Sequence, residues 1–278
     1  MKELLIQKNT DLKEENIDFK AIKTSGDINQ NVKLSEIGGK NLFCKEIEEK
    51  LLKKEIDIAV HSLKDMESVE DGNLFIGAYL KRNDYRDVII SNKIKSLEDL
   101  KGKIVIGSSS KRRELQLKKI NKNISVISLR GNIDTRIKKL KEGIYDAIIL
   151  SYAGIKFLNL DEEISEIFSV NKIIPSAGQG IIALQCREKD NKIISILKKI
   201  NHYETYKRAH AERNILKVLE GDCETAVGAH SKIEGDKITV EAELFSLDGS
   251  KRFHEKKTGK LEKFSHIGRE VGLSLIHI

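Results

Sequence analysis

Between residues 88 and 150, short apolar runs alternate with amphipathic segments, and this alternation limits the choice of fold more than any other feature. The apolar runs are VIIS (88–91), KIVIG (103–107), ISVISL (124–129) and YDAIIL (145–150). Helical patterns begin at Lys111 and extend from Asn132 to Glu142. Strands interleaved with helices are typical of βαβ units, so the sequence predicts an α/β fold with a largely parallel sheet.

The flanking segments predict a second α/β unit and a smaller unit of a different kind. Strands are predicted at IDFKAI (17–22), IDIAV (56–60) and IIALQC (181–186), and helices at 41–55, 190–200 and 203–219. In 237–259, Val240, Ala242 and Leu244 alternate with polar residues before a DG turn, which predicts an antiparallel hairpin with one solvated face. The tail from Leu261 is helical in pattern, so we expect two α/β units followed by an α+β unit.

Length and composition are those of a globular protein of two or three domains. The chain has 278 residues, of which 39% are apolar and 33% charged. No run reaches the roughly 18 apolar residues of a membrane span, and no signal peptide is visible, so a cytoplasmic location is expected. Cys44, Cys186 and Cys223 are an odd number at wide spacings, which favours neither a disulfide framework nor a metal site.

The net charge of +7 has two interpretations, a lysine-rich solvated surface or an anionic partner. Nucleic acid would match the charge. However, aromatic residues make up only 5% of the chain, tryptophan is absent, and no nucleic-acid-binding motif is found. A small polyanion is an equally good candidate for the partner.

The stretch AVHSLKDM (59–66) places polar residues directly after a predicted buried strand. Ligands bind at this position in open α/β sheets. One interpretation is a helix N-terminus capped by Ser62 or Asp65. The other is functional, with Lys64 and Asp65 delivered together to a cleft.

Two further strand ends carry arginines. GSSSKRRELQ (107–116) has three serines before a helix that opens with basic residues, and hydroxyls, backbone N–H groups and the helix dipole together suit an anion. SLRGNIDTR (128–136) repeats the arrangement, with Asn132 as a predicted N-cap. The alternative is a set of solvated arginines. Together the two stretches predict a pocket for several carboxylates, built from Arg112, Arg113, Arg130 and Arg136.

Two other stretches have weaker signals. IPSAGQGIIALQCR (174–187) contains two glycines and ends on Arg187, a cation just past a strand, although a plain domain crossover explains it equally well. In LEGDCETAVGAH (219–230), Cys223 lies in a polar turn, which is unusual for a cysteine of the core.

Taken together, these stretches resemble the porphobilinogen deaminase family, also called hydroxymethylbilane synthase. The resemblance covers nearly the whole chain, in order and spacing. It is carried by GGKNLF (38–43), HSLKD (61–65), GSSSKRRELQL (107–117), SLRGNIDTRIKKL (128–140), YDAIILSYAGI (145–155), PSAGQGIIALQCR (175–187) and HAERNILKVLEGDCETAVGAH (210–230).

The resemblance implies two periplasmic-binding-protein-like lobes with mixed sheets and a smaller α+β C-terminal domain. Domain 1 would comprise 1–80 and 181–198, domain 2 would comprise 86–174, and domain 3 would comprise 203–278. Family members begin with a further strand and a Gly–Thr–Arg segment, and their last helix is longer. The resemblance therefore implies a fragment that folds poorly or works weakly.

The family joins four porphobilinogen molecules head to tail with loss of ammonia, and then releases hydroxymethylbilane by hydrolysis. The resemblance implies a dipyrromethane cofactor bound through a thioether to Cys223. Asp65 would be the catalytic residue, an ionised carboxylate beside the cationic pyrroles. The residues implied to contact the cofactor are Lys64, Asp65, Ser110, Arg112, Arg113 and Arg130, and those implied to bind substrate are Lys40, Arg136 and Arg187.

The resemblance also implies a monomer that takes a small-molecule substrate and binds no nucleic acid, membrane or metal. Two other functions are compatible with parts of the sequence. A two-lobed binding protein for a small polycarboxylate would use the arginines without catalysis. A nucleic-acid-binding protein would use the charge, and its affinity would fall steeply with salt.

Overall fold

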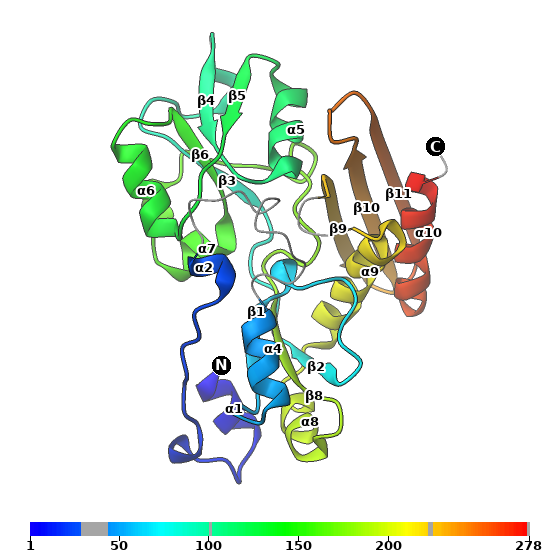
Figure 1. The fold of residues 1–278 in the computed structure, drawn as a ribbon. Coiled ribbons are helices and arrows are strands. Elements are labelled where there is room, and N and C mark those ends of the chain that lie inside the picture. The colour runs from blue at the N-terminus through cyan, green and yellow to red at the C-terminus, as the bar shows by residue number, and fades with distance from the viewer. Residues whose placement is uncertain (29–43, 100–101, 222–224, 277–278) are drawn as a thin grey trace.

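The structure is a computed structural model that describes residues 1–28, 44–99, 102–221 and 225–276. Its strands form three sheets, and each sheet lies wholly within one of the three expected units (Figure 1). The α/β fold with mixed sheets and a smaller C-terminal domain is thereby confirmed. We refer to the units as lobe one, lobe two and domain three. Their boundaries in the sequence stay a prediction.

Lobe one is built on a three-stranded sheet in the order β1-β8-β2, in which β8 pairs antiparallel with both neighbours. Its elements are α1 (Lys2–Lys8), η1 (Glu14–Asn16), α2 (Ser25–Ile28), α4 (Lys45–Leu52), β1 (Ala59–Ser62), η2 (Leu63–Asp65), β2 (Leu74–Tyr79), β8 (Ile182–Arg187) and α8 (Asn191–Lys198). The strand predicted at 17–22 is wrong. No described strand pairs with this segment, and its Phe19 is 66% exposed, so the apolar alternation lacks the partner that a strand requires.

Lobe two is built on a five-stranded sheet in the order β5-β4-β6-β3-β7. Its elements are β3 (Asp87–Ile90), η3 (Leu97–Asp99), β4 (Ile104–Gly107), α5 (Lys111–Ile120), β5 (Ile124–Ile127), α6 (Ile133–Lys141), β6 (Ala147–Ser151), α7 (Tyr152–Phe157), η4 (Asp161–Glu163) and β7 (Glu166–Ile167). The prediction of a largely parallel sheet is wrong. Among the described strands, only β4–β5 and β4–β6 are parallel, because helical crossovers join those strands, whereas β3 enters from the other lobe and runs antiparallel to β6.

The central strands of lobe two are apolar throughout because both of their faces are buried. Ile89 and Ile149 pack into one cluster, with Leu117 of α5. Their neighbours Val88 and Ile148 pack into a second cluster on the opposite face. This two-sided burial explains the continuous runs VIIS and AIIL in the sequence.

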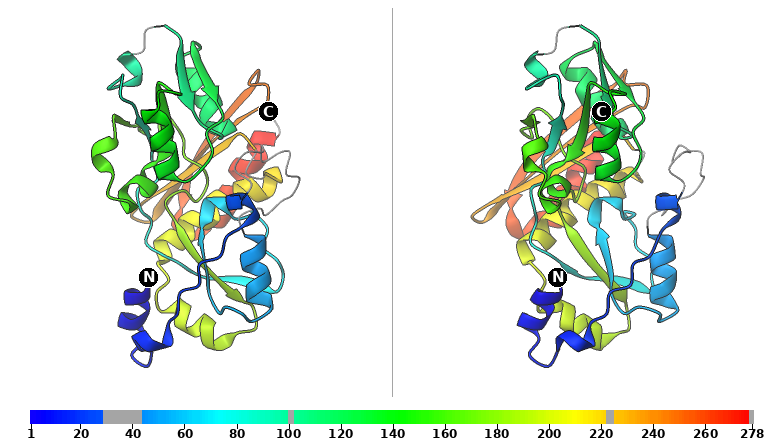
Figure 2. Two further views of the ribbon diagram at one scale, coloured as in Figure 1. Left: turned by 60° about the vertical axis from the view of Figure 1, so that its left-hand side comes forward. Right: turned by 90° about the vertical axis from the view of Figure 1, so that its left-hand side faces the viewer.

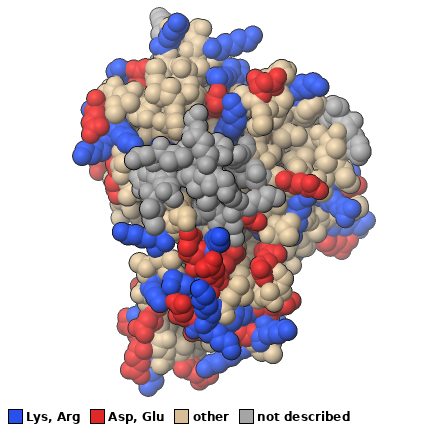
Figure 3. Space-filling model, viewed as in Figure 1, with Lys and Arg blue, Asp and Glu red and all other residues tan. Residues whose placement is uncertain are grey.

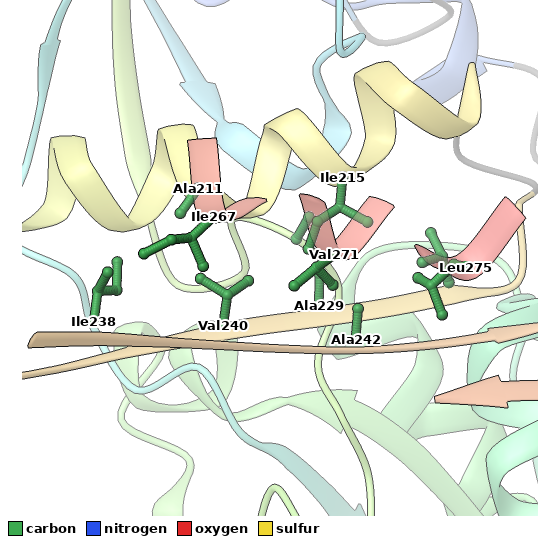
Figure 4. Packing of buried hydrophobic residues seen from close by; sticks show 11 residues of the cluster. Ala211, Ile215, Ala229, Ile238, Val240, Ala242, Ile267, Val271 and Leu275 are labelled. Carbon is green, nitrogen blue, oxygen red and sulfur yellow. The ribbon is translucent and has the colours of Figure 1, made fainter. Parts of the chain in front are cut away.

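Domain three has an antiparallel sheet in the order β11-β10-β9, covered on one face by two helices. Its elements are α9 (Tyr203–Leu219), β9 (Val227–Glu234), β10 (Lys237–Phe245), β11 (Arg252–Lys260), η5 (Leu261–Lys263) and α10 (Phe264–Ile276). Val240 of β10 packs against Ile215 of α9 and Val271 of α10 (Figure 4). Gly268 allows the close helix contact, because a Cβ there would lie 2.0 Å from the Ala211 carbonyl oxygen.

Two chain segments connect the lobes, and they run side by side. Residues 80–86 lead from β2 into β3, and residues 168–181 lead from β7 back to β8. The Asn83 backbone N–H donates to the Gly180 carbonyl at 2.8 Å. In both further views lobe two stays at the end of the molecule opposite lobe one (Figure 2). No helix among the described residues is long and apolar enough to cross a membrane.

Candidate active site at the junction of the lobes

Lys64 and Asp65 lie at the end of β1, in the short helix η2 that follows the strand. The Leu63 backbone N–H donates to the Ile181 carbonyl at 3.0 Å, and its side chain is buried, so η2 is held against lobe one. Ser62 stands at the N-cap position of η2, as the helix N-terminus interpretation predicts, but its side chain makes no capping bond. Both charged side chains are only partly buried. Among the described residues, no ion pair involves the Asp65 carboxylate.

Arg112 and Arg113 project from the first turn of α5 and share one buried carboxylate of lobe two. Ser110 caps this helix by accepting from the Arg113 backbone N–H. Arg112 Nη1 lies 2.9 Å from Asp87 Oδ2, and Arg113 Nη2 lies 2.7 Å from Asp87 Oδ1. Burial alone would raise the pKa of Asp87, but the two guanidinium groups outweigh it and hold the pKa well below its usual range. The solvated-arginine interpretation is thus wrong for this pair.

Arg136 lies on α6, which begins as predicted at an Asn132 cap that accepts from the Thr135 backbone N–H at 2.9 Å. Its Nε donates to the Gly131 carbonyl at 2.7 Å, which fixes the side chain beside the turn that carries Arg130. Burial, with Arg113 and Arg130 nearby, lowers the pKa of Arg136 to about 10. The arginines from two strand ends are therefore close enough to repel one another.

The two lobes bring their charges together at this point. Burial lowers the pKa of Lys64 to about 8, with Asp65 opposing the shift and Arg113 and Arg112 adding to it. Five cations, Lys64, Arg112, Arg113, Arg130 and Arg136, thus face two carboxylates, Asp65 and Asp87. We call these seven residues the cation-rich group. Its surplus of positive charge is suited to a ligand with several acid groups.

Four predicted site residues are not counted in this group, namely Ser110, Arg187, Lys40 and Cys223, and Ser110 instead caps α5. Arg187 lies at the end of β8 that is opposite to Ser62, because Ser62 pairs with Ile182. Its guanidinium donates to Asp57 at 2.6 Å and to Asp190 at 2.8 Å, so its charge is paired within lobe one, and its role in binding substrate stays a prediction. Lys40 and Cys223 lie outside the described residues.

The cation-rich group depends on residues that the sequence analysis did not single out. Asp87 is completely buried and organises the arginine pair, and Gln179 donates to it at 2.9 Å. Nearby, Arg82 and Glu212 form a buried ion pair at 2.6 Å. A charged residue at the head of an apolar strand run was a usable signal for Asp87, whereas nothing local in the sequence marks the Arg82–Glu212 pair.

The donors that remain in the group suit an acidic cofactor. Arg113 Nε is buried and has no hydrogen-bond partner in the described part of the chain. A carboxylate could accept from it. On the face in Figure 3, acidic and basic side chains of lobe one are interspersed and form no continuous basic stripe. In the described ranges, no group of three or more His, Cys, Asp or Glu side chains could hold a metal ion.

A two-lobed α/β fold with arginines converging at the lobe junction is suited to a ligand with several acid groups. Comparison with known proteins is more specific. Residues 2–195 match the family model "porphobilinogen deaminase, dipyromethane cofactor binding domain", and residues 206–277 match "porphobilinogen deaminase, C-terminal domain". The chain belongs to the porphobilinogen deaminase family, whose members are transferases.

Curated relatives agree over most of their length. The chain is 40% identical to porphobilinogen deaminase of Syntrophomonas wolfei over 260 residues, which is 94% of this chain and 85% of that protein. It is 43% identical to that of Rickettsia bellii over 242 residues, covering 86% and 81%. Among solved structures, the BvgS periplasmic VFT2 domain of Bordetella pertussis is similar with a TM-score of 0.41 and 16% identity, covering 71% of this chain and 73% of that one.

Proposed function

We propose that this chain is a hydroxymethylbilane synthase, which condenses four porphobilinogen molecules head to tail with release of ammonia. The observation that carries the proposal is the convergence of Asp65 with five cations from two lobes in a chain of this family. Each pyrrole brings two carboxylates, so a growing chain needs several cations at once. A binding protein for polycarboxylates would need the cations but not Asp65.

The cation-rich group would hold both the cofactor and the growing chain. Arg112, Arg113, Arg130 and Lys64 would bind acid side chains of the dipyrromethane, with the Ser110 hydroxyl as a further donor. Arg136 and Lys40 would bind those of the incoming substrate, and Cys223 would carry the cofactor through a thioether. The bound cofactor supplies the pyrrole carbon at which the chain grows.

The role of Asp65 would be to stabilise the positive charge of the reacting pyrrole rather than to bind its acid groups. A positive charge develops on the pyrrole as the amine leaves, and an ionised carboxylate beside the ring N–H stabilises it. The same carboxylate can accept a proton from the coupled ring.

The test is turnover of porphobilinogen, followed by ammonia release and by hydroxymethylbilane formation. Asp65→Asn should lower kcat by about 100- to 1,000-fold, the usual effect of removing one charge-stabilising group. Asp134→Asn is the matched control, since Asp134 is an exposed acid in the first turn of α6. Equal activity of the Asp65→Asn and wild-type proteins would contradict the assignment, and binding of porphobilinogen without ammonia release would favour the binding protein.

The assembly and location of the protein are part of the same proposal. We expect a monomer in the cytoplasm, with domain boundaries at 1–80 with 181–198, 86–174 and 203–278. Sedimentation velocity tests the monomer, and limited proteolysis tests the boundaries, since cuts should fall first in exposed segments between units.

A further inference from the structure

Gln179 occupies an unusual position, in the segment that connects lobe two back to lobe one. It is completely buried and lies between two glycines. Gly180 has φ of 80°, and a Cβ there would lie 2.8 Å from the Asn83 carbonyl oxygen, so the two connecting segments touch backbone to backbone at this point. The Gln179 side chain therefore lies where the two segments that connect the lobes are in contact.

The two ends of the Gln179 amide meet groups of opposite kind. Its Oε1 accepts from Lys64 Nζ of lobe one at 3.4 Å. Its Nε2 donates to Asp87 Oδ1 of lobe two at 2.9 Å and to the Tyr85 carbonyl at 2.7 Å. A neutral amide has both an acceptor for the ammonium and a donor for the carboxylate, whereas a carboxylate has no donor and an ammonium no acceptor.

Resting on the proposed function, we infer that Gln179 is a positioning residue that couples the Lys64 ammonium of lobe one to the Asp87–Arg112–Arg113 cluster of lobe two. It acts through these groups and touches no reacting atom. By fixing the position of Lys64 relative to this cluster, it determines where the acid groups of the substrate chain bind.

A second buried glutamine provides a matched control. Gln185 of β8 is also completely buried, and its amide joins His61 Nε2 at 3.0 Å to Glu48 Oε1 at 3.0 Å. This bridge lies wholly within lobe one and includes no member of the cation-rich group. Substituting either glutamine removes a similar buried bridge, but only Gln179 connects the lobes.

The first measurement reads the charge of Lys64 without relying on turnover. Acetylation of Lys64 by acetic anhydride, followed by peptide mass spectrometry across a pH series, reports its pKa. The charged groups that face Lys64 are Asp65, Asp87, Arg112 and Arg113, and none of these changes in the variants. In the wild type the rate should be half-maximal near pH 8, where burial places the Lys64 pKa.

The variants should move this profile in opposite directions. Gln179→Met removes the acceptor from the ammonium, so half-maximal acetylation should shift down by about one pH unit, the equivalent of one hydrogen bond to a charged group. Gln179→Glu places a carboxylate beside Lys64 and should shift it up. Gln185→Met should leave it in place. A profile unchanged in both Gln179 variants would overturn the inference.

The second measurement is turnover of the cofactor-loaded enzyme. Gln179→Met should reduce kcat/KM for porphobilinogen about tenfold, mainly through KM, whereas Gln185→Met should retain the wild-type value once thermal stability is matched. Equal losses in the two variants would mean a purely structural role and overturn the inference. Wild-type protein that shows the predicted Lys64 profile but no turnover would instead contradict the proposed function.

Discussion

Two buried carboxylates, Asp87 and Glu212, lie close to the connecting segments, and both are completely buried beside arginine. The Glu212 carboxylate accepts two hydrogen bonds from the Arg82 guanidinium, at 2.6 and 3.1 Å. It also accepts from the Gly178 and Ser231 backbone N–H groups, each at 2.8 Å. One carboxylate is thus matched by one guanidinium and fully hydrogen-bonded. Asp87 instead faces two arginines, and its Oδ2 has no well-directed hydrogen bond.

From this difference we infer a structural role for the Arg82–Glu212 pair and a binding role for the Asp87 cluster. The Arg82–Glu212 pair has balanced charges and no unused hydrogen-bonding groups for a ligand, and it holds α9 of domain three to the connecting segments. An unbalanced cluster keeps positive charge and unused donors, such as Arg113 Nε, at the lobe junction. We therefore expect the Glu212 pair to govern stability and the Asp87 cluster to govern turnover.

The largest effect on stability is expected from Glu212→Ala. It leaves the Arg82 guanidinium buried without its carboxylate, which costs about 3–5 kcal/mol in the free energy of unfolding. Urea denaturation measures this loss. The double variant Arg82→Met/Glu212→Leu should recover most of it, because no unpaired charge remains. A Glu212→Ala protein as stable as the wild type would contradict the claim that the Arg82–Glu212 pair governs stability.

Asp87→Asn should reduce turnover more than stability. The amide keeps the side-chain volume but loses the charge that holds both arginines, so kcat/KM for porphobilinogen should fall about 10- to 100-fold, corresponding to about 1.4–2.8 kcal/mol. Stability should fall less than in Glu212→Ala, since the arginines retain the carbonyls of Ile174 and Ile149 as acceptors. Steady-state kinetics and urea denaturation on the same preparations decide this. A variant that is strongly destabilised but fully active would reverse the assignment of the two carboxylates.

A smaller effect is expected from Arg136→Met, which removes one cation of the surplus. KM should rise about tenfold while kcat changes little, because the lost contact is to an acid group distant from the reacting carbon. Stability should be unaffected or slightly improved, since Arg113 and Arg130 repel Arg136. Exposed Lys138→Met, on the same helix, is the control for loss of charge alone. An equal rise in KM in the control would indicate long-range attraction rather than a specific contact.

The smallest expected effect is on the loss of stability at low pH. The arginines hold the pKa of Asp87 below that of the unfolded chain, and Arg82 does the same for Glu212 after opposing the effect of burial. Each carboxylate therefore contributes stability that is present above its unfolded pKa of about 4 and is lost as pH falls below it. In Asp87→Asn the free energy of unfolding should decline less steeply between about pH 5 and pH 3. An unchanged slope would mean that Asp87 is not held ionised by its arginines.

Sequence patterns predicted the local features of the site but not its long-range contacts. The runs around Lys111 and Asn132 marked two helices and the Asn132 cap, and the apolar strands before them placed Arg112, Arg113, Arg130 and Arg136 at strand ends. These features arise from interactions a few residues apart. The sequence did not show that Arg187 lies at the opposite end of the sheet from Ser62, because strand direction within lobe one depends on β8 returning from the other lobe. The Gln179 bridge and the Arg82–Glu212 pair, the latter between residues 130 apart, were invisible for the same reason.

Intact-mass measurement of the purified protein tests the central claim most directly, namely that a tethered oligopyrrole is held by the cation-rich group. Wild-type protein should carry the added mass of one dipyrromethane and gain further pyrrole units when porphobilinogen is supplied. Cys223→Ala should carry neither, while Arg136→Met should keep the dipyrromethane and gain units more slowly. The same added mass on the Cys223→Ala protein, or none on the wild type, would contradict the claim.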